Sequence, residues 1–155
     1  MNKILITTLL FAFAGVCAGQ ITGTTPSSAV KGSSAPYTEG PVWTLTFVKT
    51  KAGLSDDYLR QISQTVKPVY EAAKTQKLVL DYKVLTGDSF GMNDADIIIM
   101  VEYPNMAAFD GLREKMDPIL EKAMGSEDQR RNTMVKRLDT REILGVKTMR
   151  EITLK

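Results

Sequence analysis

Residues 65–74 read TVKPVYEAAK, and residues 115–124 read KMDPILEKAM. In both stretches a proline interrupts apolar residues that recur at helical spacing. At an offset of fifty residues Pro68 aligns with Pro118, and the apolar residues around the prolines align as well. The matching pairs are Leu59 and Phe109, Ile62 and Leu112, Val66 and Met116, Val69 and Ile119, and Ala73 and Ala123. Two helices interrupted in the same register indicate a duplicated unit.

A proline inside a helix removes a backbone hydrogen bond and costs about 3 kcal/mol. We expect each helix to bend and follow a curved sheet, with the freed carbonyl turned to water. The alternative is that the bend opens a cavity between helix and sheet. We favour the first interpretation, because helix kinks usually have such local causes.

Strand-forming sequences flank both helices. Residues 42–50 (VWTLTFVKT), 78–85 (LVLDYKVL) and 96–103 (DIIIMVEY) are rich in β-branched and aromatic residues, as strands are. A last strand is predicted over residues 141–154, with a bulge or bend at Gly145. The order β-α-β-β-α-β predicts an α+β ferredoxin-like fold with a four-stranded antiparallel sheet.

Capping residues mark where the helices begin. Ser55 and Asn105 are predicted to cap the two main helices. Ser126 and Gln129 have the spacing of a capping box, which predicts an extra short helix before the last strand, through about Leu138.

The N-terminus has the pattern of a secretory signal. Residues 1–18 carry one early lysine, an apolar run from Ile4 to about Ala14, and small residues that predict cleavage after Ala18. An uncleaved anchor is the less favoured alternative, because the run is shorter than the roughly 20 apolar residues of a transmembrane helix. We therefore expect an exported protein, periplasmic or secreted, without a stable membrane anchor.

Composition restricts the chemistry. The chain has no histidine, and its single cysteine, Cys17, lies in the predicted signal. The commonest general base, the thiol nucleophile and the usual zinc and haem ligands are therefore absent from the mature chain, and we expect no cofactor. The net charge of +2 argues against binding to nucleic acid.

Residues 19–41 are dominated by Gly, Ser, Thr and Pro, and we predict a flexible tether there.

The folded domain is predicted over residues 42–155. Its strands are apolar on both faces, whereas its helices can cover only one face. The other face is predicted to carry Thr46, Val48, Val79, Ile98 and Met100. Exposing such an apolar patch to water is unfavourable. We therefore expect two sheets to pair face to face in a homodimer.

The chain resembles the dimeric α/β-barrel superfamily, which includes antibiotic-biosynthesis monooxygenase-like and NIPSNAP-like proteins, and within it a branch of exported bacterial proteins. The resemblance covers residues 42–154 and rests on the element order, the strand VWTLTFVKT, the junction DADIIIMVEYPNMAAFD and the strand REILGVKTMREITLK. It implies a homodimer that binds a small hydrophobic ligand or acts as a non-enzymatic module.

The alternative implied by the resemblance is a cofactor-independent monooxygenase or isomerase that acts on a small aromatic or acyl substrate. Related monooxygenases use substrate-assisted oxygen activation, with tryptophan and asparagine in the pocket. Trp43 is the only tryptophan, and neither Asn93 nor Asn105 aligns with a pocket asparagine.

The candidate ligand-binding residues are Trp43, Tyr82, Tyr103 and Arg150. Strand alternation predicts that the three aromatic residues face the helices, with Arg150 joining them from the last strand. Aromatic rings with a polar edge suit a pocket for a planar or acyl ligand. Core packing is the favoured explanation, because such aromatic residues routinely fill cores. A second set, Asp81, Lys83 and Glu102, is predicted on the opposite face, as cross-strand pairs or, for a carboxylate, as a base.

Three further motifs have ordinary explanations. Residues 87–90 (GDSF) resemble a hydrolase nucleophile block, but a turn explains them because no histidine is available. A loop with the oxygen-bearing residues Asp88, Asn93, Asp94 and Asp96 is predicted to be a hairpin and not a calcium site, so we expect no metal. The basic residues Arg130, Arg131, Lys136, Arg137 and Arg141 are predicted to form a solvated face, because acidic residues intersperse them.

Overall fold

The computed structural model describes residues 35–155. The predicted signal peptide and most of the predicted tether lie outside the described residues. The elements, in chain order, are β1 (Tyr37–Thr50), α1 (Ser55–Thr75), β2 (Asp81–Thr86), β3 (Ile97–Tyr103), η1 (Met106–Phe109), α2 (Leu112–Met124), α3 (Glu127–Lys136), η2 (Arg137–Asp139) and β4 (Arg141–Leu154). Among these residues, no helix has the length and apolar character needed to cross a membrane.

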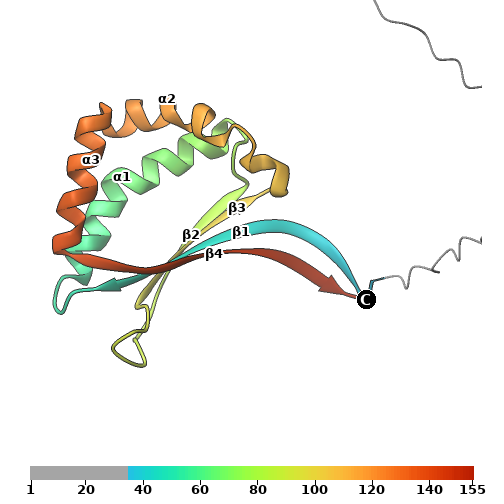
Figure 1. Ribbon diagram of the computed structural model, residues 1–155, viewed down its shortest axis with the longest axis horizontal. Helices are drawn as coiled ribbons and strands as arrows, with labels where there is room; N and C mark the ends of the chain where they lie inside the picture. Colours follow the sequence, from blue (N-terminus) through green and yellow to red (C-terminus); the bar gives the residue numbers. More distant parts are fainter. Residues whose placement is uncertain (1–34) are drawn as a thin grey trace, which may run out of the picture. The chain divides into compact units, whose positions relative to one another are not determined.

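The four strands form one antiparallel sheet in the order β2-β3-β1-β4. The two central strands, β1 and β3, come from the two halves of the chain, as in a split β-α-β fold. The helices α1, α2 and α3 all lie on the same side of this sheet (Figure 1). The predicted α+β ferredoxin-like fold is therefore confirmed, including the extra helix before the last strand.

The core lies between the helices and one face of the sheet. On β3 the residues Ile97, Ile99, Val101 and Tyr103 are buried, and the residues between them are only half-buried. This period of two is typical of a strand with one covered face. Val69 and Ala73 of α1 and Ile119 of α2 pack on the Tyr103 end, and Tyr58 and Ile62 of α1 pack on the Ile97 end.

The sheet face away from the helices, here called the open face, carries a continuous apolar surface. Its members pair across β2, β3, β1 and β4, and none has a helix above it: Leu85, Ile98, Met100, Trp43, Leu45, Phe47 and Met149. The prediction for this face was right for Ile98 and Met100. It was wrong for Val48 and Val79, which are buried in the core, at 0% and 2% exposure, and for Thr46, which shares the side of Ile99.

Both prolines lie inside their helices, Pro68 in α1 and Pro118 in α2. Together they line a groove of about 400 Å³ between the two helices, with Ala72, Ile119 and Lys122 among its other walls. No strand residue lines this groove. The prolines therefore line a surface between helices. The alternative, a bend that opens a cavity between helix and sheet, stays a prediction.

Element ends differ from the predictions in several places. β1 begins at Tyr37, so residues 37–41, assigned to the tether, belong to the sheet. Ser55 is the first residue of α1, and the capping position is Leu54, without a side-chain cap. Asn105 caps η1 by accepting a hydrogen bond from Ala108 N at 3.2 Å, and α2 begins only after Gly111.

The two ends of the described chain meet. Lys155 N donates a hydrogen bond to Pro36 O at 3.0 Å, because β1 and β4 pair from Tyr37 and Leu154 onwards. The register of this pair shifts near Gly145, which confirms the predicted irregularity. The β1–β4 pair extends past the helices, and the C-terminus lies at its far tip (Figure 1).

Candidate functional site

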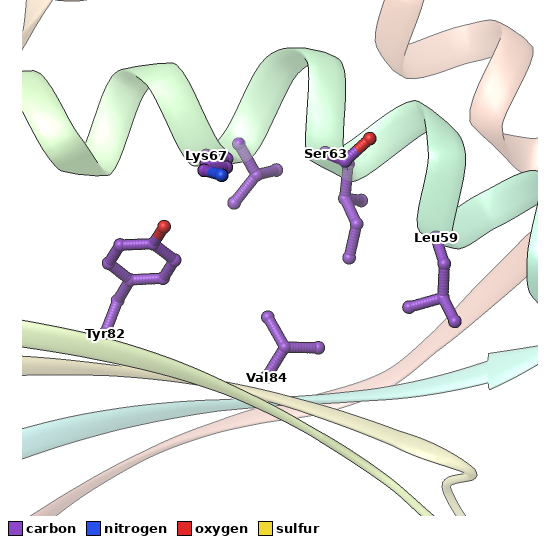
Figure 2. Close-up of a pocket in the computed structure, with 7 residues that line it drawn as sticks. Leu59, Ser63, Lys67, Tyr82 and Val84 are labelled. Atoms are coloured by element: carbon purple, nitrogen blue, oxygen red, sulfur yellow. The ribbon is translucent and has the colours of Figure 1, made fainter.

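A mostly apolar pocket lies between α1 and the edge strand β2. Its cavity volume is about 240 Å³. Side chains from α1 and β2 face each other across it (Figure 2): Leu59, Ile62, Ser63, Val66 and Lys67 from the helix, and Tyr82 and Val84 from the strand. The pocket is thus formed by one face of α1 and by the helix-facing residues of β2.

Tyr82 is the predicted site residue that lines this pocket. Its hydroxyl donates a hydrogen bond to Glu71 Oε1 at 2.9 Å, and its ring stacks on Tyr70 with the centroids 5.3 Å apart. Burial, together with the hydrogen bond to Glu71, raises the pKa of Tyr82 to about 12. The phenol is thus held neutral and in a fixed orientation at the pocket wall.

Tyr103 lies in the core beyond Tyr70, away from the pocket. Its ring packs 4.6 Å from that of Phe109, measured between centroids. Burial raises the pKa of Tyr103, and a hydrogen bond with the Thr44 side chain opposes that rise. Tyr103 is therefore on the predicted side of the sheet but packs against side chains of the core.

Trp43 lies on the open face, so the prediction that it faces the helices is wrong. It pairs across the sheet with Glu102, whereas its neighbour Val42 pairs with the buried Tyr103. The indole Nε1 donates to Glu151 Oε2 at 3.0 Å, and Lys83 Nζ lies 5.1 Å from the ring centroid. Glu102 and Lys83 are thus on the face predicted for them, together with Trp43.

Arg150 does not join the tyrosines. It forms an ion pair with Glu39 of β1, and β1 and β3 lie between its strand and that of Tyr82. Asp81, predicted for the open face, makes an ion pair with Lys74 of α1 at 2.8 Å. The structure therefore brings Tyr82 to a pocket and separates it from Trp43 and Arg150.

Sequence reasoning missed the polar rim of the pocket. Ser63 and Lys67 are one helical turn apart and flank the apolar stripe of α1, so they lie at the border between the covered and the exposed side of the helix. Spacing of i and i+4 places two side chains on one helix face. That spacing was available in the sequence, whereas the position of β2 across from it was not.

The loop between β2 and β3 is held by a hydrogen bond within the loop and by hydrogen bonds to the end of β1. Asp94 Oδ2 accepts from Phe90 N at 2.8 Å, and Asp96 Oδ1 accepts from Thr50 N at 2.9 Å. Ser89 Oγ is hydrogen-bonded to Lys49 Nζ. Across residues 35–155 no group of three or more His, Cys, Asp or Glu side chains is placed to hold a metal ion.

The basic cluster divides into two kinds of residue. Arg130 and Arg131 pair with Asp117 and Asp128 near the surface. Arg137 and Arg141 are buried, at 3% and 7% exposure, so the prediction of a solvated face is wrong for these two. They lie beside Tyr58 of α1, whose ring centroid is 5.6 Å from the Arg141 guanidinium carbon.

No family model matches this chain, and no curated protein matches it either. Solved structures similar to it include a dimeric ferredoxin-like protein from an uncultured marine organism, at 9% identity and a TM-score of 0.44, over 76% of this chain and 90% of that one. A second dimeric ferredoxin-like protein from an uncultured marine organism shows 15% identity and a TM-score of 0.44, over 74% of this chain and 97% of the other.

A NIPSNAP family protein with unknown function from Agrobacterium tumefaciens is also similar, at 9% identity and a TM-score of 0.44, over 75% of this chain and 90% of that one. The ferredoxin-like fold itself rests on the strand order and register of this chain.

Proposed function

We propose that this chain is an exported homodimer, released from its signal after Ala18, that binds a small hydrophobic molecule in the pocket beneath α1. The observation that carries the proposal is the pocket wall. Leu59, Ile62, Val66 and Val84 provide apolar surface, and Ser63, Lys67 and Tyr82 provide a few polar groups. Mostly apolar walls with a small number of polar groups are typical of ligand sites.

The volume of the pocket limits the size of the ligand. At about 240 Å³ the cavity is just below the range of about 300–1,000 Å³ that is usual for drug-sized ligands. A short acyl chain or a single aromatic ring fits this space. The Lys67 ammonium at the rim favours a ligand with an acidic or polar head.

Binding is favoured over the monooxygenase or isomerase alternative by the position of two residues. The resemblance implied a tryptophan in the pocket, and Trp43 lies on the open face instead. Tyr82 keeps its proton at neutral pH, because its pKa is raised to about 12, so it is not poised to act as a base. Its hydroxyl is also engaged with Glu71.

A bulky residue at the rim should block the pocket. We expect Ser63→Trp to weaken the binding of octanoate and of indole, measured by isothermal titration calorimetry, by about tenfold or more, because overfilling a packed site costs about 1–3 kcal/mol. Native mass spectrometry of the wild-type protein should also reveal a small molecule that co-purifies and is released unchanged.

Two controls separate the pocket from the rest of the molecule. Gln64→Trp places the same indole on the next residue of α1, which does not line the pocket, and should leave binding unchanged. Trp43→Ala changes the open face and should also bind normally. Equal affinities for Ser63→Trp and wild type, with both proteins folded by circular dichroism, would overturn the proposal.

A further inference from the structure

The two buried arginines lack a counter-charge. No ion pair within residues 35–155 includes Arg137 or Arg141. The Nε atoms of both are buried without a hydrogen-bond partner. Arg137 uses its Nη atoms on Thr65 Oγ1 and, at 3.5 Å, on the Met134 sulfur, which are both uncharged. Unpaired buried charges are costly, and native proteins pair almost all of them.

The electrostatic environment agrees with this geometry. Burial lowers the pKa of Arg137; the phenol of Tyr58 opposes this fall, and the neighbouring positive charge of Arg141 adds to it. Tyr58 is itself buried, at 2% exposure. Two guanidinium groups and a phenol therefore share one site with no carboxylate in contact.

The rest of the chain is poorly placed to supply the missing charge. Residues 1–34 contain neither aspartate nor glutamate. Lys155 lies at the opposite end of β4 from Arg141. Glu142 adjoins Arg141 and lines the same cleft, but the ion pairs within residues 35–155 do not include one between these two side chains. The counter-charge is therefore expected from another molecule.

A cleft leads from the surface to Arg141. It has a volume of about 450 Å³ and is lined by Lys51, Leu138, Arg141, Glu142 and Ile143. Leu138 and Ile143 are 58% and 46% exposed and form an apolar wall. This cleft lies at the β4 edge of the sheet, whereas the pocket beneath α1 lies at the β2 edge.

We propose that Arg141, with Arg137 and Tyr58 as its buried neighbours, binds a small organic carboxylate in this cleft. The apolar body of the ligand lies against Leu138 and Ile143. The planar guanidinium group matches a carboxylate through two parallel hydrogen bonds. Lys51 at the mouth adds a third positive charge, and Glu142 is the one acidic residue that lines the cleft. The apolar wall favours an organic acid over an inorganic anion.

Calorimetric titration of the full chain with benzoate tests the site, with benzamide as a neutral ligand of the same shape and inorganic phosphate as an anion without an apolar body. We expect benzoate to bind best. Arg141→Met and Arg137→Met should each weaken it by about tenfold or more, and Arg131→Gln, on the exposed face of α3, should leave it unchanged. Equal binding of benzamide, tighter binding of phosphate, or unchanged affinity in both methionine variants would overturn the proposal.

Thermal unfolding gives a second readout. Without ligand, Arg137→Met should melt at a higher temperature than wild type, because an unpaired buried charge is replaced by an apolar side chain of similar length. Benzoate should raise the melting temperature of wild type and not that of the variant. A lower melting temperature for Arg137→Met than for wild type, without ligand, would contradict the proposal that this buried charge is unpaired.

A measurement on the unaltered protein does not depend on the folding of any variant. In ¹H–¹⁵N spectra, benzoate should shift the Nε–H signals of Arg137 and Arg141 and leave that of Arg131 in place. If a second copy of the chain neutralised these arginines instead, Arg141→Met would weaken the dimer and benzoate would shift neither signal.

Discussion

A single residue, Tyr70, connects the two halves of the core. It packs against the buried residues at both ends of β3 and stacks on Tyr82 at the pocket wall. Burial raises its pKa to about 12, as burial disfavours the charged phenolate. The ring therefore fixes the position of Tyr82 while remaining neutral itself.

The raised pKa of Tyr70 predicts how stability changes at alkaline pH. Between about pH 10 and pH 12 the unfolded chain loses this proton while the folded chain keeps it. Stability that is fully present below pH 10 should therefore fall as pH rises toward 12. In Tyr70→Phe this fall should be smaller, as measured by urea unfolding at several pH values. Parallel curves for the two proteins would contradict the assignment.

Trp43 and Arg137 show what a sequence cannot decide about single residues. β1 is apolar on both faces, so alternation predicts two faces without saying which one the helices cover. The small residues Val42 and Val48 are in the core, and the bulky Trp43 is outside it. The burial of Arg137 depends on its contact with Thr65, 72 residues away, which no local pattern reveals.

α3 is an element held mainly by its ends. It has no buried residues, so packing contributes little to it. Its first turn is closed by a capping box in which Ser126 N donates to Gln129 Oε1 at 2.8 Å, and Gln129 N donates to Ser126 Oγ at 3.4 Å. Gly125 makes room for this box, because a Cβ there would lie 2.0 Å from Gln129 Oε1.

Removal of the cap should therefore loosen α3 and the arginine that follows it. We expect Ser126→Ala to lower the free energy of unfolding by about 1 kcal/mol and to speed amide hydrogen exchange along residues 127–136. Asn132→Ala, in the exposed middle of the same helix, is the control and should have little effect. Unchanged exchange in Ser126→Ala would show that other contacts hold the helix.

Elements were predicted better than their ends. Both main helices, all four strands and the capping box of α3 follow from periodicity and capping residues, because these signals are local. The extension of β1 to Tyr37 does not follow from such signals. Residues 37–41 contain a glycine and a proline, and they form a strand because they pair with β4. The pocket was missed for a similar reason, because it depends on how Tyr82 and Val84 of β2 lie across from α1, and no local pattern shows a contact between two elements.

At the scale of the whole molecule, the open face is the main exposed apolar surface of the sheet. Ile98 lies near its middle, between Leu85 of β2 and Phe47 of β1. In the proposed homodimer this face is covered by its counterpart. We expect Ile98→Asp to convert the dimer to a monomer in sedimentation experiments, since burying an unpaired carboxylate costs several kcal/mol.

Val146→Asp is the matched control for this change. Val146 is 66% exposed. It pairs with Thr46, which in turn pairs with Ile99, so it lies on the other face of the sheet. It should leave the dimer intact. A wild-type protein that sediments as a monomer at micromolar concentration would contradict the predicted barrel.

The hydrogen bond between Lys155 and Pro36 has a mechanical consequence. A force that pulls the two ends of the domain apart would act at one tip of the β1–β4 pair, in the direction perpendicular to the two strands. It would load the rungs one after another, beginning at Tyr37 and Leu154, since antiparallel hydrogen bonds run perpendicular to the strands. Under tension the strands would separate from that tip first, while the helices and the pocket beneath α1 remained unloaded.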